Sequence, residues 1–174
     1  YFSISTTTRK IREGETQGVH YHFVSEEEFK QDIEDDMFLE HAYVHGNYYG
    51  TSIRPVKHAL KSGKLVIFDI DVQGNAVVTS RLGDITTSVF ISPPTLSELK
   101  VRLEARQTDT QEVIAGRLKM ARKEIHRICE YDYLVINNDL EKAAQTLRTI
   151  AKAARLKIPG SDINEFSQKW EDID

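Results

Sequence analysis

The chain consists of short apolar runs that alternate with longer segments in which apolar residues recur every three or four positions. The short runs are typical of strands, and the longer spacing is typical of helices that bury one face. Strands are expected over residues 1–5, 21–24, 38–44, 65–71, 87–91 and 133–136. Helices are expected over 52–62 and 140–156, after Ser25, Gly74 and Thr95, and through the apolar positions from Ile114 to Ile128. This alternation predicts an α/β fold with a parallel sheet flanked by helices.

The helix after Ser25 has a clear start signal. Ser25 is placed to cap it, and Glu28 follows three residues later, which is the spacing of a capping box. Phe29, Ile33 and Met37 then form its apolar stripe. The acids of its first turn are therefore interpreted as capping and solvated charge, and not as catalytic groups.

The segment over residues 65–71 reads Leu-Val-Ile-Phe-Asp-Ile-Asp and predicts a fully buried parallel strand. Its acids, Asp69 and Asp71, fall at the carboxyl end of the strand, where open α/β sheets bind ligands. An acid that closes so apolar a strand needs a partner, and a cation or a magnesium-bound water is suitable. Asp69 is therefore a candidate for a magnesium-dependent site.

The stretch over residues 39–52 combines one acid, Glu40, with a pair of tyrosines and two hydroxyl side chains. An acid in an apolar and aromatic run is costly to bury unless it meets hydrogen-bond donors. Glu40 is thus a candidate for binding a ligand that presents paired N–H groups. The alternative is a solvated glutamate at a strand edge, which the stretch alone favours.

Two clusters of arginines are candidate anion sites. Arg9 and Arg12 lie three residues apart after a row of hydroxyl side chains, and the planar guanidinium fork suits a phosphate. A basic surface loop is the alternative, and it is slightly favoured by this segment alone. Arg102, Arg106 and Arg117 flank a polar break and are placed to share another anion.

Composition excludes several classes of function. The 174 residues suit one domain, and a net charge of −4 gives no electrostatic footprint for nucleic acid. No apolar run has the length of a membrane span. The single cysteine, Cys129, excludes an internal disulfide and fits a reducing compartment, so a cytoplasmic location is expected.

A series of motifs occurs in a fixed order along the chain. They are Ser5-x-x-x-Arg9-x-x-Arg12-x-Gly14-Glu15, Tyr21-His22-Phe23-Val24-Ser25, Glu40, Gly46-Asn47-Tyr48-Tyr49-Gly50-Thr51, Asp69-Ile70-Asp71-Val72-Gln73-Gly74, Arg102-Leu-Glu-x-Arg106 and Asn137-Asn-Asp139-Leu140. Together they resemble guanylate kinase, from Ser3 to about Ile150. The resemblance implies a P-loop NTPase-like α/β core over 1–5 and 51–156, a small mixed α+β GMP-binding insertion over 6–50, a helical lid at about 102–122 and a tail over 157–174.

The same resemblance implies a role for each matched residue. The GMP phosphate is assigned to Ser5, Arg9, Arg12, Tyr21 and Tyr49. Guanine is assigned to Glu40, Thr51 and Asp71, and ATP to Arg102 and Asn137. Catalysis is assigned to Arg106, Arg117 and Asp69, with Asp69 near Mg²⁺ and contacting it through water. The implied reaction is magnesium-dependent phosphoryl transfer from ATP to GMP, giving ADP and GDP, by a monomer or homodimer.

No G-x-x-x-x-G-K-[ST] phosphate loop occurs in the 174 residues. The family places this loop before the matched region, and the chain opens within a predicted strand, so we expect an N-terminal segment to be absent from the sequence. Residues 1–174 alone are then expected to catalyse poorly, because the ATP β-phosphate has no backbone cradle.

Smaller departures from the family pattern are Ile11, Gln107 and Asn138, where proline, glycine and aspartate are common. Gln107 is expected to stiffen the lid hinge. The alternative function is a kinase-dead module of related fold that binds a phosphorylated protein partner. Retention of the base-reading and magnesium groups, Glu40 and Asp69 among them, favours the enzyme.

Overall fold

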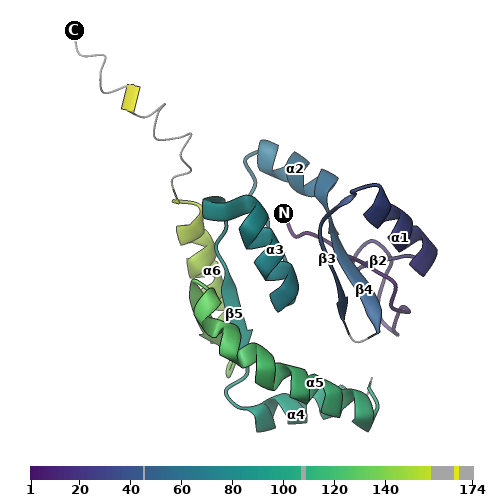
Figure 1. Cartoon of the computed structure of the whole chain (residues 1–174). Coiled ribbons are helices and arrows are strands. Elements are labelled where there is room, and N and C mark those ends of the chain that lie inside the picture. The colour runs from purple at the N-terminus through teal and green to yellow at the C-terminus, as the bar shows by residue number, and fades with distance from the viewer. Residues whose placement is uncertain (45, 107–108, 158–166, 169–174) are drawn as a thin grey trace. The chain divides into compact units, whose positions relative to one another are not determined.

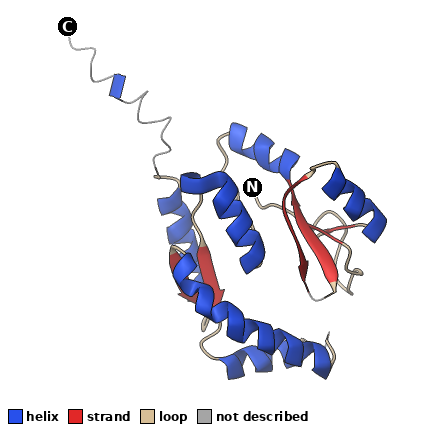
Figure 2. Ribbon diagram, in the orientation of Figure 1, coloured by secondary structure: helices blue, strands red, loops and turns tan. Residues whose placement is uncertain are grey.

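The computed structural model describes residues 1–44, 46–106, 109–157 and 167–168. The chain divides into two compact units, Tyr1–Val78 and Thr79–Asp174. Helices and strands of both units confirm the predicted α/β class (Figure 2). The predicted insertion over 6–50 lies within the first unit, and its limits remain a prediction.

The first unit is built on a four-stranded sheet in the order β2-β1-β4-β3 (Figure 1). Its strands are β1 (Thr6–Thr7), β2 (His22–Phe23), β3 (Phe38–Val44) and β4 (Asn47–Ser52). β1 pairs in parallel with β2 and antiparallel with β4, and β3 and β4 form an antiparallel hairpin. The predicted strand over 38–44 is confirmed. Register across the hairpin pairs Glu40 with Thr51, which brings two predicted site residues together.

Helix α1 (Glu26–Glu34) packs on the hairpin through its aromatic residue. The predicted capping box is confirmed, because Ser25 Oγ accepts from Glu28 N and the Glu28 carboxylate accepts from Ser25 N. Phe29 is fully buried and stacks on Phe38 with 4.5 Å between ring centroids. A Cβ on Gly50 would lie 2.9 Å from each of these rings, so β4 needs glycine there.

Two further helices follow the hairpin. The helix predicted over 52–62 is confirmed as α2 (Ile53–Lys61), with Ser52 at its N-cap. The chain then turns at Gly63, whose φ of +68° favours glycine. Helix α3 (Val72–Leu82) begins directly after Asp71.

The strands predicted over 1–5 and 65–71 are reduced to one isolated parallel bridge, between Phe2 and Ile67. Backbone hydrogen bonds support it, from Ser3 N to Ile67 O at 2.9 Å and from Ile67 N to Tyr1 O at 2.8 Å. The prediction of a fully buried strand is wrong: Ile67 is 46% exposed, and Asp69 is also exposed. An apolar run is buried only where other elements cover it, which its own sequence does not determine.

The second unit is largely helical around a two-stranded parallel sheet. Its elements are η1 (Gly83–Ile85), β5 (Val89–Ser92), α4 (Leu96–Ala105), α5 (Gln111–Glu124), η2 (Ile125–Glu130), β6 (Tyr133–Ile136) and α6 (Leu140–Ala154). The strand predicted over 133–136 is confirmed as β6, and the one predicted over 87–91 is found two residues later at its start, as β5. The apolar run over 133–136 is typical of a buried strand, but Val135 alone among the β6 residues is buried.

An acid and a hydroxyl fix the start of this sheet. Asp132 Oδ2 accepts from Ser88 N at 2.7 Å and from Ser88 Oγ at 2.9 Å, and Asp132 N donates to Ser88 Oγ at 3.0 Å. The hydrogen bond from Ser88 N holds the pKa of Asp132 below its ordinary value. These bonds set the register in which Val89 pairs with Tyr133.

Helices α4 and α5 lie side by side, as Figure 1 shows. Thr95 and Thr110 cap them, accepting from Glu98 N and Val113 N respectively. The apolar stripe predicted up to Ile128 is divided, because α5 ends at Glu124 and the chain tightens into η2.

The C-terminal predictions have mixed outcomes. The helix predicted over 140–156 is confirmed as α6 (Leu140–Ala154), and the Asp139 side chain caps it by accepting from Lys142 N. In the tail, Phe166 and Trp170 are four residues apart, which predicts a short docking helix, and Pro159-Gly160 predicts the end of the preceding helix. These four residues lie outside those that the structure describes. Among the helices that are described, none is both long enough and apolar enough to cross a membrane.

Candidate functional site

Glu40 is a buried acid at the centre of the first unit's candidate site. Thr51 Oγ1 donates a hydrogen bond of 2.6 Å to Glu40 Oε1. Glu40 is 5% exposed and Thr51 is fully buried, so the alternative of a solvated glutamate at a strand edge is wrong. Burial raises the pKa of the Glu40 carboxyl, the hydrogen bond from Thr51 opposes this, and the Asp71 carboxylate raises the pKa further. A ligand with N–H donors would stabilise the ionised carboxylate.

Asp71 begins α3 and brings Gly74 against Glu40. Asp71 Oδ1 accepts from Gly74 N at 2.8 Å, and Asp71 O accepts from Asn75 N at 2.9 Å. A Cβ on Gly74 would lie 2.8 Å from Glu40 Oε2 and 3.2 Å from Ile70 Cβ. Only glycine therefore leaves the carboxylate its observed position.

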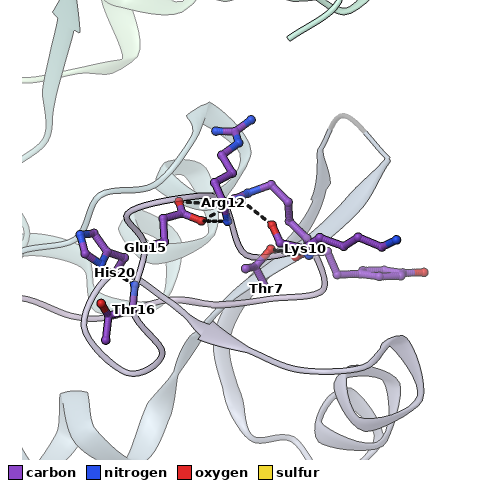
Figure 3. Close-up of polar contacts among 8 residues, drawn as sticks. Thr7, Lys10, Arg12, Glu15, Thr16 and His20 are labelled. Atoms are coloured by element: carbon purple, nitrogen blue, oxygen red, sulfur yellow. Dashed lines mark hydrogen bonds and ion pairs between the residues drawn. The ribbon is translucent and has the colours of Figure 1, made fainter. Parts of the chain in front are cut away.

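Arg9 forms an ion pair with Glu15, an acid for which the sequence analysis predicted no role. Its Nη2 lies 2.7 Å from Glu15 Oε1, its Nη1 lies 3.0 Å from Glu15 Oε2, and Nη1 also donates to Lys10 O at 2.7 Å. The same carboxylate accepts from Arg12 N at 2.7 Å. Figure 3 shows Glu15 beside the backbone of Arg12, with the Arg12 side chain extending away from the carboxylate. One acid thus contacts both arginines of the loop over residues 9–15, which is called the arginine loop from here on.

This ion pair perturbs both of its partners. The hydrogen bonds from Arg9, with a smaller contribution from Arg12 N, lower the pKa of Glu15 to about 2, although its partial burial opposes the shift. The hydrogen bond to Glu15 raises the pKa of Arg9 above its already high value. Both groups are therefore charged throughout the physiological range of pH.

Aromatic side chains surround the Arg9 guanidinium. Its central carbon lies 5.3 Å from the ring centroid of Tyr21 and 5.6 Å from that of Phe23, which are cation–π distances. The Tyr21 and Tyr49 rings meet edge to face at 6.0 Å. Burial raises the pKa of the Tyr21 hydroxyl, and the Asp69 carboxylate raises it further. Three residues assigned to the GMP phosphate, Arg9, Tyr21 and Tyr49, are thus brought together.

Two threonines join the arginine loop to β4. Thr7 Oγ1 donates to Tyr48 O at 2.8 Å and accepts from Arg9 N at 3.2 Å. Thr8 Oγ1 accepts from Tyr48 N at 3.0 Å. Ser5, just before β1, accepts through its carbonyl oxygen from His22 N at 2.9 Å. The phosphate role of its hydroxyl remains a prediction.

The arginines of the second unit have separate environments. Arg102 donates to Glu98 Oε1 at 2.7 Å and to Asn137 O at 2.8 Å, which brings the two predicted ATP residues together. Arg106 ends α4 and is exposed. Arg117 Nε lies 3.3 Å from Asp109 Oδ2, and the predicted hinge residue Gln107 lies outside the described residues.

Magnesium was predicted beside Asp69. Within the part of the chain that is described, no cluster of three or more metal-ligating side chains is present. Mg²⁺ typically keeps several waters and uses one or two carboxylates together with substrate phosphates. The exposed Asp69 carboxylate, near Tyr21, fits that mode of binding.

Glu15 and Gly74 are the functional candidates that sequence reasoning missed. Both were part of quoted motifs, but neither received a role. The available signal for Glu15 was an acid three residues after Arg12 with a glycine between them. Gly14 has a φ of +81°, and Glu15 N donates to Arg12 O at 3.1 Å, so the loop folds back on itself.

Comparison with known proteins gives this geometry a family context. The family model described as guanylate kinase matches residues 1–154. A guanylate kinase of Sulfurimonas denitrificans is 72% identical over 173 residues, which are 99% of this chain and 84% of that relative. A guanylate kinase of Helicobacter pylori is 50% identical over 171 residues, covering 98% of this chain and 82% of the relative.

A solved structure is also similar. The crystal structure of guanylate kinase from Anaplasma phagocytophilum superimposes with a TM-score of 0.85 at 30% identity, covering 100% of this chain and 86% of that one. Curated relatives that are named as kinases do not favour the alternative of a kinase-dead module. The family match begins at residue 1 and gives no support to the expected absence of an N-terminal segment.

Proposed function

Because the chain belongs to the guanylate kinase family, we propose that its Tyr1–Val78 unit binds GMP through the residues just described. The activity is that of a guanylate kinase, the transfer of a phosphoryl group from ATP to GMP, giving ADP and GDP. Such a reaction asks the protein mainly to position the reactants and neutralise charge. The assignments below follow that requirement.

The buried pair of Glu40 and Thr51 is the observation that carries the proposal. Guanine presents an N1–H group and an amino group on one edge, and the Glu40 carboxylate accepts from both. Asp71, close enough to raise the pKa of Glu40, lies beside the same edge. Adenine lacks this donor pair and leaves a buried carboxylate unpaired, a mismatch that discriminates by orders of magnitude.

The GMP phosphate binds at the arginine loop. Arg9, Arg12, Tyr21 and Tyr49 supply donors, with the Ser5 hydroxyl beside them. Support comes from the guanidinium of Arg9, which has five N–H groups, donates three hydrogen bonds to Glu15 and Lys10, and also interacts with the Tyr49 hydroxyl. Its other N–H groups match the bidentate recognition of an anion.

The transfer step needs residues that hold magnesium, contact ATP and neutralise the transferring group. Asp69 would hold a water of the magnesium ion, and Mg²⁺ would neutralise phosphate charge when it is bound. Arg106 and Arg117 close over the transferring group, while Arg102 and Asn137 contact ATP. Closure excludes water, which otherwise competes with GMP as the acceptor. A cytoplasmic location is proposed from the single exposed thiol, Cys129.

Nucleotide binding and turnover test the proposal. Isothermal titration calorimetry with GMP, AMP and ATP compares the chain with Glu40→Ala and with Glu34→Ala, which removes an exposed acid of α1 as a matched control. We expect Glu40→Ala alone to weaken GMP binding, with ATP unaffected. ADP release that requires GMP and ignores AMP supports the activity. Equal loss of GMP and ATP binding removes Glu40 from the base site.

A further inference from the structure

We propose that Glu15 is a positioning residue of the GMP phosphate site, because its carboxylate orients the Arg9 guanidinium before the nucleotide arrives. This inference rests on the proposed function of the arginine loop. Glu15 itself has no donor for a phosphate, since an ionised carboxylate only accepts hydrogen bonds. Its effect on GMP must therefore act through Arg9 and Arg12.

The contacts of Glu15 are those of an orienting group. Both of its oxygens meet the planar fork of Arg9, at 2.7 and 3.0 Å, which fixes the rotation of the guanidinium as well as its place. The Arg9 and Glu15 side chains are 13% and 17% exposed, so solvent screens the pair only weakly. The bond from Arg12 N to the same carboxylate also fixes the backbone that carries the second arginine.

The remaining contacts of Arg9 hold the guanidinium from other sides. Lys10 O accepts from Nη1, and the rings of Tyr21 and Phe23 lie within cation–π range. Three classes of contact thus converge on one cation. The N–H groups that neither Glu15 nor Lys10 uses keep a fixed direction, and no side-chain ordering is left for the phosphate to impose.

The sign of the effect separates positioning from simple charge. A carboxylate near a phosphate repels it, so charge alone predicts that removal of Glu15 tightens GMP binding. Positioning predicts the opposite, because a mobile arginine loses rotamer entropy when it binds. The loss is at most about 30-fold in affinity, which corresponds to the full entropy of an arginine side chain.

The experiment measures GMP and guanosine affinity by calorimetry on the full chain. The variants are Glu15→Ala, Glu15→Gln and, as a control of equal charge, Glu13→Gln at an exposed position of the same loop. We expect Glu15→Ala to weaken GMP by about 10- to 30-fold and guanosine by less than about twofold. Glu15→Gln keeps one acceptor oxygen and should fall between wild type and alanine. Glu13→Gln should not weaken GMP.

A double variant tests whether Glu15 acts through Arg9. In an Arg9→Ala background, Glu15→Ala should cause no further loss of GMP affinity, because the group it orients is absent. The inference is overturned by GMP binding that is unchanged or tighter in Glu15→Ala, by equal loss of guanosine, or by additive loss in the double variant. If Glu15→Ala does not fold, the glutamine variant decides by the same criteria. Folded wild-type chain that binds no GMP refutes the proposed function instead.

Discussion

Gly74→Ala inserts one methyl group between α3 and Glu40, the buried acid of the proposed base site. The new Cβ would lie 2.8 Å from Glu40 Oε2 and 3.2 Å from both Glu40 Cδ and Ile70 Cβ. The carboxylate has little room to retreat, since Glu40 is 5% exposed and Thr51 holds it at 2.6 Å. The methyl group should therefore displace the acid from the position in which it is proposed to bind guanine.

The magnitude follows from packing energies. Overpacking of a buried site costs about 1–3 kcal/mol, and alanine recovers about 0.5–1 kcal/mol over glycine within a helix. The unfolding midpoint should consequently fall only modestly. If GMP requires the original position of the Glu40 carboxylate, the whole overpacking cost opposes binding. GMP affinity should then drop by roughly 5- to 150-fold.

Calorimetry with GMP and thermal unfolding without ligand measure the two effects. Gly116→Ala is the matched control, because Gly116 lies exposed within α5 and a Cβ there meets no atom within 4 Å. It should leave GMP affinity unchanged and raise the midpoint slightly. Wild-type GMP affinity in Gly74→Ala, at any stability, would refute the steric role assigned to this glycine.

Three further substitutions have defined outcomes. The raised pKa of Glu40 means that its contribution to stability is present below its ordinary value of 4.5 and is lost as pH rises through the folded pKa. The melting temperature of Glu40→Gln relative to wild type should therefore rise as the pH is raised from 4 to 7.5, and the variant should bind GMP more weakly. A difference in melting temperature that does not change with pH contradicts this. Arg117→Ala should lower kcat and leave the Kd of GMP unchanged, as expected for a group that acts at the transferring phosphoryl group; a weaker Kd would show a ground-state role. Asp132 has a lowered pKa, so its stabilisation is present above 3.8 and disappears in acid; Asp132→Asn should melt earlier at pH 7 by scanning calorimetry, and the difference should vanish towards pH 2.

Local signals explain what the sequence predicted well. The start of α1 is determined by Ser25 and Glu28, three residues apart, and the strand over 38–44 is determined by its own side chains. The same applies to the cap at Asp139. These features depend on residues that are close together in the sequence, so they can be predicted from one sequence alone.

Long-range contacts explain what it predicted poorly. The burial of residues 65–71 depends on the elements that cover them, and Ile67 is 46% exposed despite its apolar surroundings in sequence. Gly74 matters because Glu40 lies against it, a contact between residues far apart in the chain. Resemblance to a family indicated Glu40 and Thr51 as partners of one base, but their direct hydrogen bond became visible only in the register of the β3–β4 hairpin.

The hydrogen bond between Thr51 and Glu40 also sets the polarity of the proposed base site. A hydroxyl has a single proton, and Thr51 directs it to the carboxylate. Towards a ligand, Thr51 and ionised Glu40 then present lone pairs alone. A purine that presents an oxygen or an unprotonated ring nitrogen to these two acceptors is repelled. Hypoxanthine has N1–H but no amino group, so it leaves one acceptor lone pair without a donor. Selection among purines at this site therefore depends on the number of N–H donors on the edge of the base, and not on the size of the base alone.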